Sequence, residues 1–388
     1  MISPHRFRPR GRLLDFMRQA GNPRLINLAA GLPSTEAVPA EPIRFAFERA
    51  LAESFEEATG YQVPDGDYQL RALIAQRLGQ REITARAEDL VVTTGCTQAL
   101  HGMIRLLTDP GSVVACEAPA YYATLEILGD LDLQVLPLPV RDQNGIDLDL
   151  LETLFERYRP KLFVLCSTLS NPSGVTVPNA ARKSLVEICR RTGTKILEDE
   201  IYGELSEDPA LRPIRAFDDG STVAFVSSFS KTVAPGVRVG FCLPGGSTDA
   251  FALLKCQQDM HSATVCEVAF RHYLELNLFD QHLDYLRRFN RARRELAASA
   301  IASAFPSDIK VWIPSGGFML WVDLGENRPV DPIYQASLEQ NVAFCRGSAF
   351  FTSPDRELNA MRLNCSRPSE EDLITGLDIL GRILRAGR

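Results

Sequence analysis

The chain contains Val223-Ala224-Phe225-Val226, then Ser228-Phe229-Ser230-Lys231, and then Pro235-Gly236-Val237-Arg238-Val239-Gly240. The apolar run predicts a strand, and hydroxyls, a lysine and an arginine follow it within a short loop. Lysine is scarce, and the first one in the chain is Lys161. Arginine supplies most of the positive charge. Ligands of α/β sheets bind beyond the carboxyl ends of strands. Taken alone, Lys231 also fits a surface lysine after a strand.

Five more apolar runs of the same kind surround this one. They are continuous rather than alternating, which suits strands covered on both faces. Helical-period segments lie between them at 97–107 and 180–192. This alternation of strand and helix predicts an α/β fold with a mostly parallel sheet sandwiched by helices. The five runs are Leu90 to Thr94, Val113 to Cys116, Leu162 to Cys166, Lys195 to Glu198 and Val239 to Cys242.

The pattern changes after about residue 276. A long charged helix is expected at 280–305, then strands at 309–312 and 318–323, and a helix from Glu370. The length of 388 residues exceeds what one core usually supports. We therefore expect a large α/β domain at 46–275, a smaller α+β domain at 276–388, and an N-terminal segment at 1–45 that packs on the small domain.

Composition excludes several classes of protein. Hydrophobic residues make up 45% and charged residues 23%, as in ordinary globular proteins, and the net charge of −7 argues against nucleic acid or membrane as partner. No apolar run is long enough to span a bilayer, and the basic N-terminus lacks the apolar stretch of a signal peptide. The nine cysteines and five histidines form no metal-ligating or disulfide pattern. A cytoplasmic protein without a metal site is expected.

Polar clusters follow the predicted strands, and each has a chemical interpretation besides that of an ordinary turn or cap. Gly95, at a helix start, would let an anion approach backbone N–H groups. Asp199 could keep a pyridine nitrogen protonated, and Asn171 could reach a cofactor oxygen. Arg362, in a strand-like run, could bind a carboxylate at two points.

The cluster around Lys231 adds the remaining chemistry. A lysine amine forms a Schiff base with an aldehyde, and nearby hydroxyls with a guanidinium can hold a phosphate. Pyridoxal 5′-phosphate (PLP) carries both groups. The sequence therefore indicates a PLP site in which these clusters converge.

In order along the chain, these segments resemble the class I/II aminotransferases of PLP fold type I, and most closely the branch of 2-aminoadipate and kynurenine-type enzymes. The resemblance runs from about Leu28 to the C-terminus. It rests on Ala30-Gly31-Leu32-Pro33, Tyr61 with Gly66, Leu70-Arg71, Gly95 to Leu100, Glu117 to Tyr121, Asn171 to Gly174, Asp199 to Tyr202, Ser228 to Lys231, Gly236 to Gly240, Gly316 to Phe318 and Arg362.

The resemblance implies a role for each matched residue in cofactor binding. Lys231 would form the Schiff base and then move the proton, and Asp199 would pair with the pyridine nitrogen. Tyr202 and Asn171 would bind the ring's phenolic oxygen, and Tyr121 would stack on the ring. The phosphate would be held by Gly95, Cys96, Thr97, Ser228, Ser230 and Arg238.

The same resemblance implies the substrate contacts and the assembly. Arg362, with Asn171 and the backbone at Gly31, would bind the α-carboxylate of an amino acid or 2-oxo acid. Tyr61 would reach the phosphate of a neighbouring subunit, which implies a homodimer with shared active sites.

Three departures from the family pattern occur. Cys96-Thr97 replaces the serine or alanine and the glutamine or tyrosine common in that turn. Ser167-Thr168-Leu169-Ser170 replaces the usual proline-led approach to Asn171. Arg346 stands where proline is usual, either as surface decoration or as a selector for an acidic side chain. Arg12 and Trp312 are further candidates for side-chain selection.

The expected reaction is transfer of an amino group between an L-amino acid and a 2-oxo acid. Another PLP reaction on the same scaffold stays open: elimination or replacement, cyclisation, or oxidative deamination. A third alternative is a regulator of the kind fused to a winged helix. We expect no DNA-binding domain, since little sequence precedes Gly31 and the net charge is negative.

Overall fold

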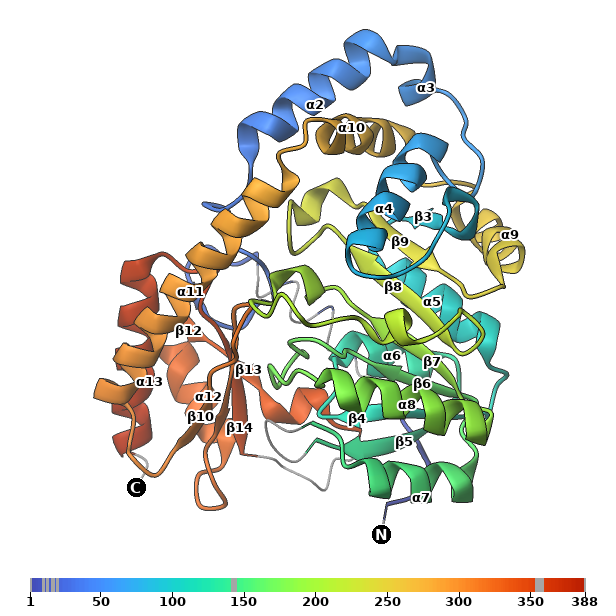
Figure 1. The fold of residues 1–388 in the computed structure, drawn as a ribbon. Coiled ribbons are helices and arrows are strands. Elements are labelled where there is room, and N and C mark those ends of the chain that lie inside the picture. Colours follow the sequence, from blue (N-terminus) through green and yellow to red (C-terminus); the bar gives the residue numbers. More distant parts are fainter. Residues whose placement is uncertain are drawn as a thin grey trace.

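The computed structural model of the chain describes residues 2–8, 11, 14, 18, 21–140, 145–352 and 359–386. Its centre is an eight-stranded sheet of order β1-β5-β4-β6-β7-β8-β9-β3 (Figure 1). The strands are β1 (His5–Arg6), β3 (Val91–Thr93), β4 (Val113–Ala118), β5 (Gln134–Pro139), β6 (Leu162–Leu165), β7 (Lys195–Asp199), β8 (Val223–Ser228) and β9 (Gly240–Leu243).

Most of this sheet is parallel. β5, β4, β6, β7 and β8 pair in parallel, whereas β9 runs antiparallel to both β8 and β3. The carboxyl ends of β3, β4, β6, β7 and β8 therefore lie at one edge, together with the residues that precede β9. The predicted mostly parallel sheet is confirmed.

Helices cover both faces of the sheet because successive strand residues point to opposite sides. Along β6, Leu162 and Val164 join the core under α5 (Cys96–Leu107), α6 (Tyr122–Asp130) and α9 (Thr248–Asp259). Phe163 and Leu165 join the core under α7 (Leu148–Tyr158) and α8 (Asn179–Thr192). Burial on both faces explains why the strands read as continuous apolar runs.

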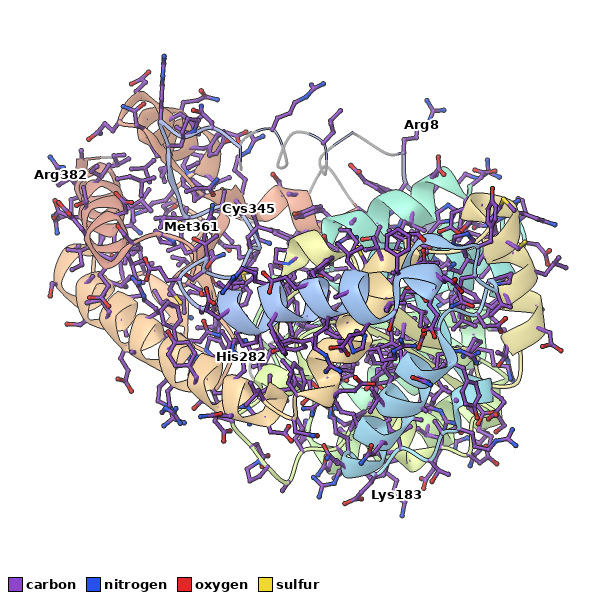
Figure 2. All side chains as sticks on the ribbon, turned by 90° about the horizontal axis from the view of Figure 1, so that it is seen from above. Arg8, Lys183, His282, Cys345, Met361 and Arg382 are labelled. Carbon is purple, nitrogen blue, oxygen red and sulfur yellow. The ribbon has the colours of Figure 1, made fainter. Side chains whose placement is uncertain are left out.

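A smaller antiparallel sheet, β10-β11-β14-β13, forms the second part of the fold. Its strands are β10 (Lys310–Trp312), β11 (Met319–Asp323), β14 (Ala360–Asn364) and β13 (Cys345–Arg346), and α11 (Phe279–Ala304), α12 (Val330–Glu339) and α13 (Glu370–Ala386) surround it. Figure 2 labels Cys345 and Met361 in this part, and His282 near the start of α11. His282 Nε2 lies 2.7 Å from the carbonyl oxygen of Thr232, one residue after Lys231.

The N-terminal residues contact both parts. β1 pairs with β5 of the large sheet, whereas β2 (Ile26–Asn27) pairs with β12 (Val342–Ala343) beside the small sheet. The chain then enters α2 (Ala40–Glu53), α3 (Phe55–Thr59) and α4 (Tyr68–Gln80), and α10 (Thr264–Glu275) packs against all three.

The six strands predicted for the large sheet are all present, but two of its eight strands, β1 and β5, are outside the predicted set. β5 contains Pro137 and Pro139, which have no N–H to donate and usually argue against a central strand. The sheet accepts them because β1 pairs with β5 only at Gln134 and Val135. Among the described residues, every helix is too short or too polar to cross a membrane.

Candidate active site

The predicted polar clusters meet at the carboxyl edge of the large sheet. Asp199 is the last residue of β7, and Ser228 is the last residue of β8. Asn171 follows β6, Tyr121 follows β4, and Gly95 follows β3 as the N-cap of α5. Parallel strands from distant parts of the sequence thus deliver the clusters to a single place.

One side of the site is a cradle for an anion. The first turn of α5, at Gly95, Cys96 and Thr97, leaves backbone N–H groups without helical partners. Ser228 Oγ donates to Ser230 Oγ over 2.8 Å, and Arg238 Nη1 lies 3.5 Å from Ser230 Oγ. Arg238 Nη2 also donates to the carbonyl oxygen of Thr94 over 2.9 Å. Helix amides, two hydroxyls and a guanidinium together suit a phosphate.

Gly95 is required in this cradle. It has a φ of +80°, and a Cβ there would collide with the guanidinium of Arg238. Across from it, a Cβ on Gly240 would lie 2.7 Å from the carbonyl carbon of Gly95. Glycine at 95 therefore leaves room for Arg238, and glycine at 240 lets the start of β9 approach the start of α5.

Asp199 is a buried carboxyl beneath the cradle. Its Oδ1 accepts a hydrogen bond from the backbone N–H of Ile201 over 3.2 Å and a weak one from Cys96 Sγ over 3.4 Å. Burial raises the pKa of Asp199 to about 6, and these two hydrogen bonds limit the rise. A cationic ring nitrogen beside Asp199 would stabilise the ionised form.

Two tyrosines flank Asp199 and Arg362. Tyr202 is buried and its ring lies 6.0 Å from that of Phe318; burial raises the pKa of its hydroxyl. Tyr121 is half-buried, and its ring packs 4.7 Å from that of Tyr122. Both phenols therefore stay neutral and able to donate hydrogen bonds at physiological pH.

Lys231 is half-buried between the two parts of the fold. Its Nζ donates to the carbonyl oxygen of Gly31 over 2.8 Å. Burial lowers the pKa of Lys231 to about 8, and the nearby Arg362 contributes to the lowering, against the attraction of Asp199. A substantial fraction of this amine is therefore neutral and nucleophilic near pH 8.

Arg362, on β14 of the small sheet, is fully buried. Its Nη1 donates to Asn171 Oδ1 over 2.8 Å, its Nη2 donates to the carbonyl oxygen of Ala29, and its carbon Cζ lies 5.2 Å from the ring centre of Phe350. Within the described residues, its buried Nε has no hydrogen-bond partner. A buried guanidinium with donor capacity to spare suits a carboxylate.

Not every candidate joins this cluster. Tyr61 is 88% exposed and contacts His261, with ring centres 5.5 Å apart. Arg346 pairs with Asp331 over 2.7 Å and lies over the ring of Tyr334, so it follows the surface interpretation. Trp312 is half-buried in β10, and Arg12 lies outside the described residues.

Two supporting residues were given no role from the sequence. Asn364 Nδ2 donates to the carbonyl oxygens of Ala30 and Leu32, and thereby holds the loop at Gly31. Glu117 Oε2 accepts from Ser170 Oγ over 2.8 Å beside Asn171. Asn364 could have been found from the sequence, because it lies two residues after Arg362 in a strand-like run and therefore on the same face of β14. Glu117 could also have been found, because it is a carboxyl near the end of an apolar strand.

These features fit PLP. The cradle at Gly95 suits its phosphate, Asp199 its ring nitrogen and Lys231 its aldehyde. The fit rests on the glycines that the cradle requires, the amine of lowered pKa and the buried carboxyl. The described residues contain no cluster of metal ligands.

Comparison with known proteins agrees with this geometry. The family described as aminotransferase class I and II matches residues 23–380. The structure of LysN, an α-aminoadipate aminotransferase of Thermus thermophilus complexed with N-(5′-phosphopyridoxyl)-L-leucine, is similar. It is 29% identical with a TM-score of 0.89, over 96% of this chain and 95% of that one.

Two further proteins are similar. The kynurenine aminotransferase of Pyrococcus horikoshii is 27% identical with a TM-score of 0.90, over 97% of this chain and 94% of that one. A protein of Escherichia coli K12 named as an uncharacterised HTH-type transcriptional regulator, YjiR, is 27% identical over 95% of this chain and 78% of its own length.

Proposed function

The chain belongs to the class I and II aminotransferases, and from that premise we propose which of its residues carry the reaction. The fold is PLP fold type I, the cofactor is PLP, and the similar structures include enzymes of the predicted 2-aminoadipate and kynurenine branch. The reaction is transfer of an amino group between an amino acid and a 2-oxo acid. The observation that supports the assignment of residues is the amine of Lys231, which donates to the Gly31 carbonyl over 2.8 Å and whose pKa is lowered by burial to about 8.

We assign the cofactor to the cradle and to Asp199. When bound, PLP supplies an aldehyde that condenses with amines and a ring that accepts an electron pair. Gly95, Cys96, Thr97, Ser228, Ser230 and Arg238 would hold its phosphate. Asp199 would hold a proton at the ring nitrogen, Asn171 and Tyr202 would donate to the phenolic oxygen, and Tyr121 would stack on the ring.

Lys231 is proposed as the proton carrier. Its neutral Nζ would take a proton from the substrate Cα, and as an ammonium group it would give the proton back. The lowered pKa supports this role, because a base works best when its pKa is close to the working pH. The Gly31 carbonyl, 2.8 Å away, would orient the amine.

Arg362 is proposed to bind the α-carboxylate of the substrate. Its hydrogen bond to Asn171 and its contact with Phe350 fix the plane of the guanidinium before a ligand arrives. Asn171 and the backbone at Gly31 would complete the carboxylate site. This would bring the substrate Cα near Lys231, since the Gly31 carbonyl contacts that residue.

The test is to replace the amine and follow the cofactor. In Lys231→Ala, conversion of the bound cofactor to its amine form by L-amino acids should slow by at least about 100-fold, as expected for loss of a general base. Lys183→Ala is the matched control, because Lys183 is exposed on α8 and points outward in Figure 2. Absorbance of the cofactor and mass spectrometry of the 2-oxo acid are the measurements.

Two outcomes would contradict these assignments. Unchanged conversion in Lys231→Ala would remove Lys231 as the proton carrier. If instead the unmodified enzyme released ammonia or a cyclised product from every donor, with the cofactor regenerated, another PLP reaction would replace amino-group transfer.

Assembly and organisation are further proposals. A homodimer with shared sites is supported by exposed apolar side chains that a second subunit could cover. They lie on α2, α3, the loop after α3, the start of α4, and α9 with its C-cap. The residues are Phe45, Leu51, Phe55, Tyr61, Val63, Tyr68, Leu253 and Met260. Tyr61 would reach the partner's phosphate. We propose a large α/β domain at 46–275, a small α+β domain at 276–388, and an N-terminal segment at 1–45 that packs on the small domain. The nine free cysteines support a reducing, cytoplasmic setting.

A further inference from the structure

The end of helix α9 contacts the loop that forms the anion cradle. Asp259, the last residue of α9, accepts a hydrogen bond at Oδ2 from Gln98 Nε2 over 2.7 Å. Gln98 Oε1 in turn accepts from the backbone N–H of Thr94 over 2.8 Å. Two hydrogen bonds therefore connect a helix end, about 160 residues further along the chain, to the residue that precedes Gly95.

Thr94 is held on several sides. Its N–H is bound by Gln98, its carbonyl oxygen accepts from Arg238, and its hydroxyl lies 3.4 Å from both Asp259 Oδ2 and Ser262 Oγ. The two peptide groups that flank Thr94 are thereby held, the first by Gln98 and the second, which joins Thr94 to Gly95, by Arg238. Because this peptide leads directly into Gly95, its orientation sets where Arg238 and the first amides of α5 point.

Asp259 determines the direction of this chain of hydrogen bonds. A carboxylate only accepts, whereas the amide of Gln98 has a donor end and an acceptor end. Asp259 therefore requires the NH₂ group of Gln98 to face it, which leaves Oε1 for the Thr94 N–H. The Nζ atom of the buried Lys255 lies 3.4 Å from Asp259 Oδ1, on the side of the carboxyl away from Gln98.

We propose that Asp259 is a positioning residue for the cofactor phosphate, acting through Gln98 and Thr94 on Arg238 and the start of α5. Asp259 does not bind the phosphate, and its negative charge alone would weaken anion binding. Its effect is to orient the donors. The inference rests on the proposed phosphate cradle, and it assigns the control of phosphate affinity to a residue outside that cradle.

The test compares two ligands that differ only by the phosphate, PLP and pyridoxal. Both are titrated into the full-length protein after removal of its cofactor, with binding followed by absorbance. In Asp259→Leu, which removes the acceptor at similar size, the Kd for PLP should rise on the order of tenfold, the usual effect of losing a hydrogen bond to a charged group. The Kd for pyridoxal should stay within about twofold, as for changes remote from a contact.

Three matched variants isolate the cause. Asp259→Asn keeps an acceptor for Gln98 and should lose less affinity for PLP than Asp259→Leu. Gln98→Leu should lose nearly as much PLP affinity as Asp259→Leu, which also removes the longer contact with the Thr94 hydroxyl, and the double variant should add little further. Asp249→Leu, an exposed acid at the other end of α9, should leave both Kd values unchanged.

The outcomes separate this inference from the assignment it rests on. Arg238→Ala should lose PLP affinity and keep pyridoxal affinity; if it does not, the cradle itself is misassigned and the inference falls with it. If Arg238→Ala behaves as expected but Asp259→Leu raises the Kd of both ligands equally, or of neither, then Asp259 has no effect on the phosphate and serves only as the last residue of α9. Tighter PLP binding in Asp259→Asn would show that charge repulsion, not orientation, is the effect of this residue.

Discussion

Asp199 shows at the scale of one residue how the site departs from what folding alone would favour. A carboxyl with few hydrogen-bond donors and 6% exposure is more stable in its neutral form. Burial raises the pKa of Asp199 to about 6, so at pH 7 to 8 the protein without cofactor holds an ionised group in an unfavourable place. A cationic ring nitrogen would remove that penalty.

The stability of the cofactor-free protein should therefore depend on pH through Asp199. A carboxyl whose pKa is raised in the folded state stabilises the fold below its unfolded pKa, and that stability is lost as pH rises through about 6. In Asp199→Asn the loss should disappear, which would stabilise the cofactor-free protein by about 3 kcal/mol at pH 8. The same variant should lose amino-group transfer.

Thermal unfolding between pH 5 and pH 8 is the measurement. The difference in Tm between Asp199→Asn and the unmodified protein should grow with pH. A difference that stays constant over this range would mean that Asp199 does not titrate there, and a less stable variant at pH 8 would reverse the argument.

Residues proposed to contact the cofactor are easier to single out in the sequence than residues proposed to act through others. Lys231 and Asp199 each follow an apolar strand and belong to a local motif. The contact of Asp259 with Gln98 joins positions with no local pattern between them, and it exists only because α9 ends beside the start of α5. Such contacts depend on tertiary packing, which local patterns do not contain.

At the scale of elements, α11 and α13 cross closely beside the small sheet. Gly381 of α13 packs directly on Ala304, the last residue of α11: a Cβ at Gly381 would lie 2.5 Å from its carbonyl oxygen and 2.7 Å from its Cβ. The two helices can approach this closely only because one of them has no side chain there.

Gly381→Ala should therefore destabilise the protein even though alanine favours helices. Overpacking at the crossing should lower the free energy of unfolding by about 1–3 kcal/mol. Gly79→Ala is the matched control, since Gly79 is an exposed residue of α4 whose Cβ would meet nothing within 4 Å. That change should stabilise by roughly 0.5–1 kcal/mol. Chemical denaturation measures both, and equal shifts in the two variants would contradict a close crossing.

Most strands of the large sheet could be predicted because burial on both sheet faces leaves a plain apolar signal. The exceptions are the two-residue β1 and β5. β5 has Pro137 and Pro139 in a run without clear alternation, and it forms a strand through its pairing with β4 and β1. Pairing partners are a property of the whole sheet, so a single segment could not reveal this strand.

At the scale of the whole molecule, Tyr61 is the residue whose proposed role needs a second copy of the chain. It is far more exposed than the other site residues and contacts His261 rather than the cradle. The sequence could suggest a shared site only through the family resemblance, because the surface of one subunit does not identify its partner.

Mixing two inactive variants tests the shared site. A subunit with Lys231→Ala keeps Tyr61, and a subunit with Tyr61→Ala keeps Lys231, so a mixed dimer would contain one complete site. Subunits unfolded together and refolded at equal amounts should regain about a quarter of wild-type activity, since half the dimers are mixed and half of their sites are complete. If Tyr61 served its own subunit, no site would be complete and no activity would return.

The environment of Arg362 has a consequence for the energetics of binding. A free arginine side chain has about 2 kcal/mol of rotamer entropy, most of which is lost when the side chain is held in one geometry. Here Asn171, Ala29 and Phe350 hold the guanidinium in place during folding. If Arg362 binds the substrate as proposed, the carboxylate would meet a donor that has little conformational freedom left to lose, so more of the gain in hydrogen bonding would appear as affinity.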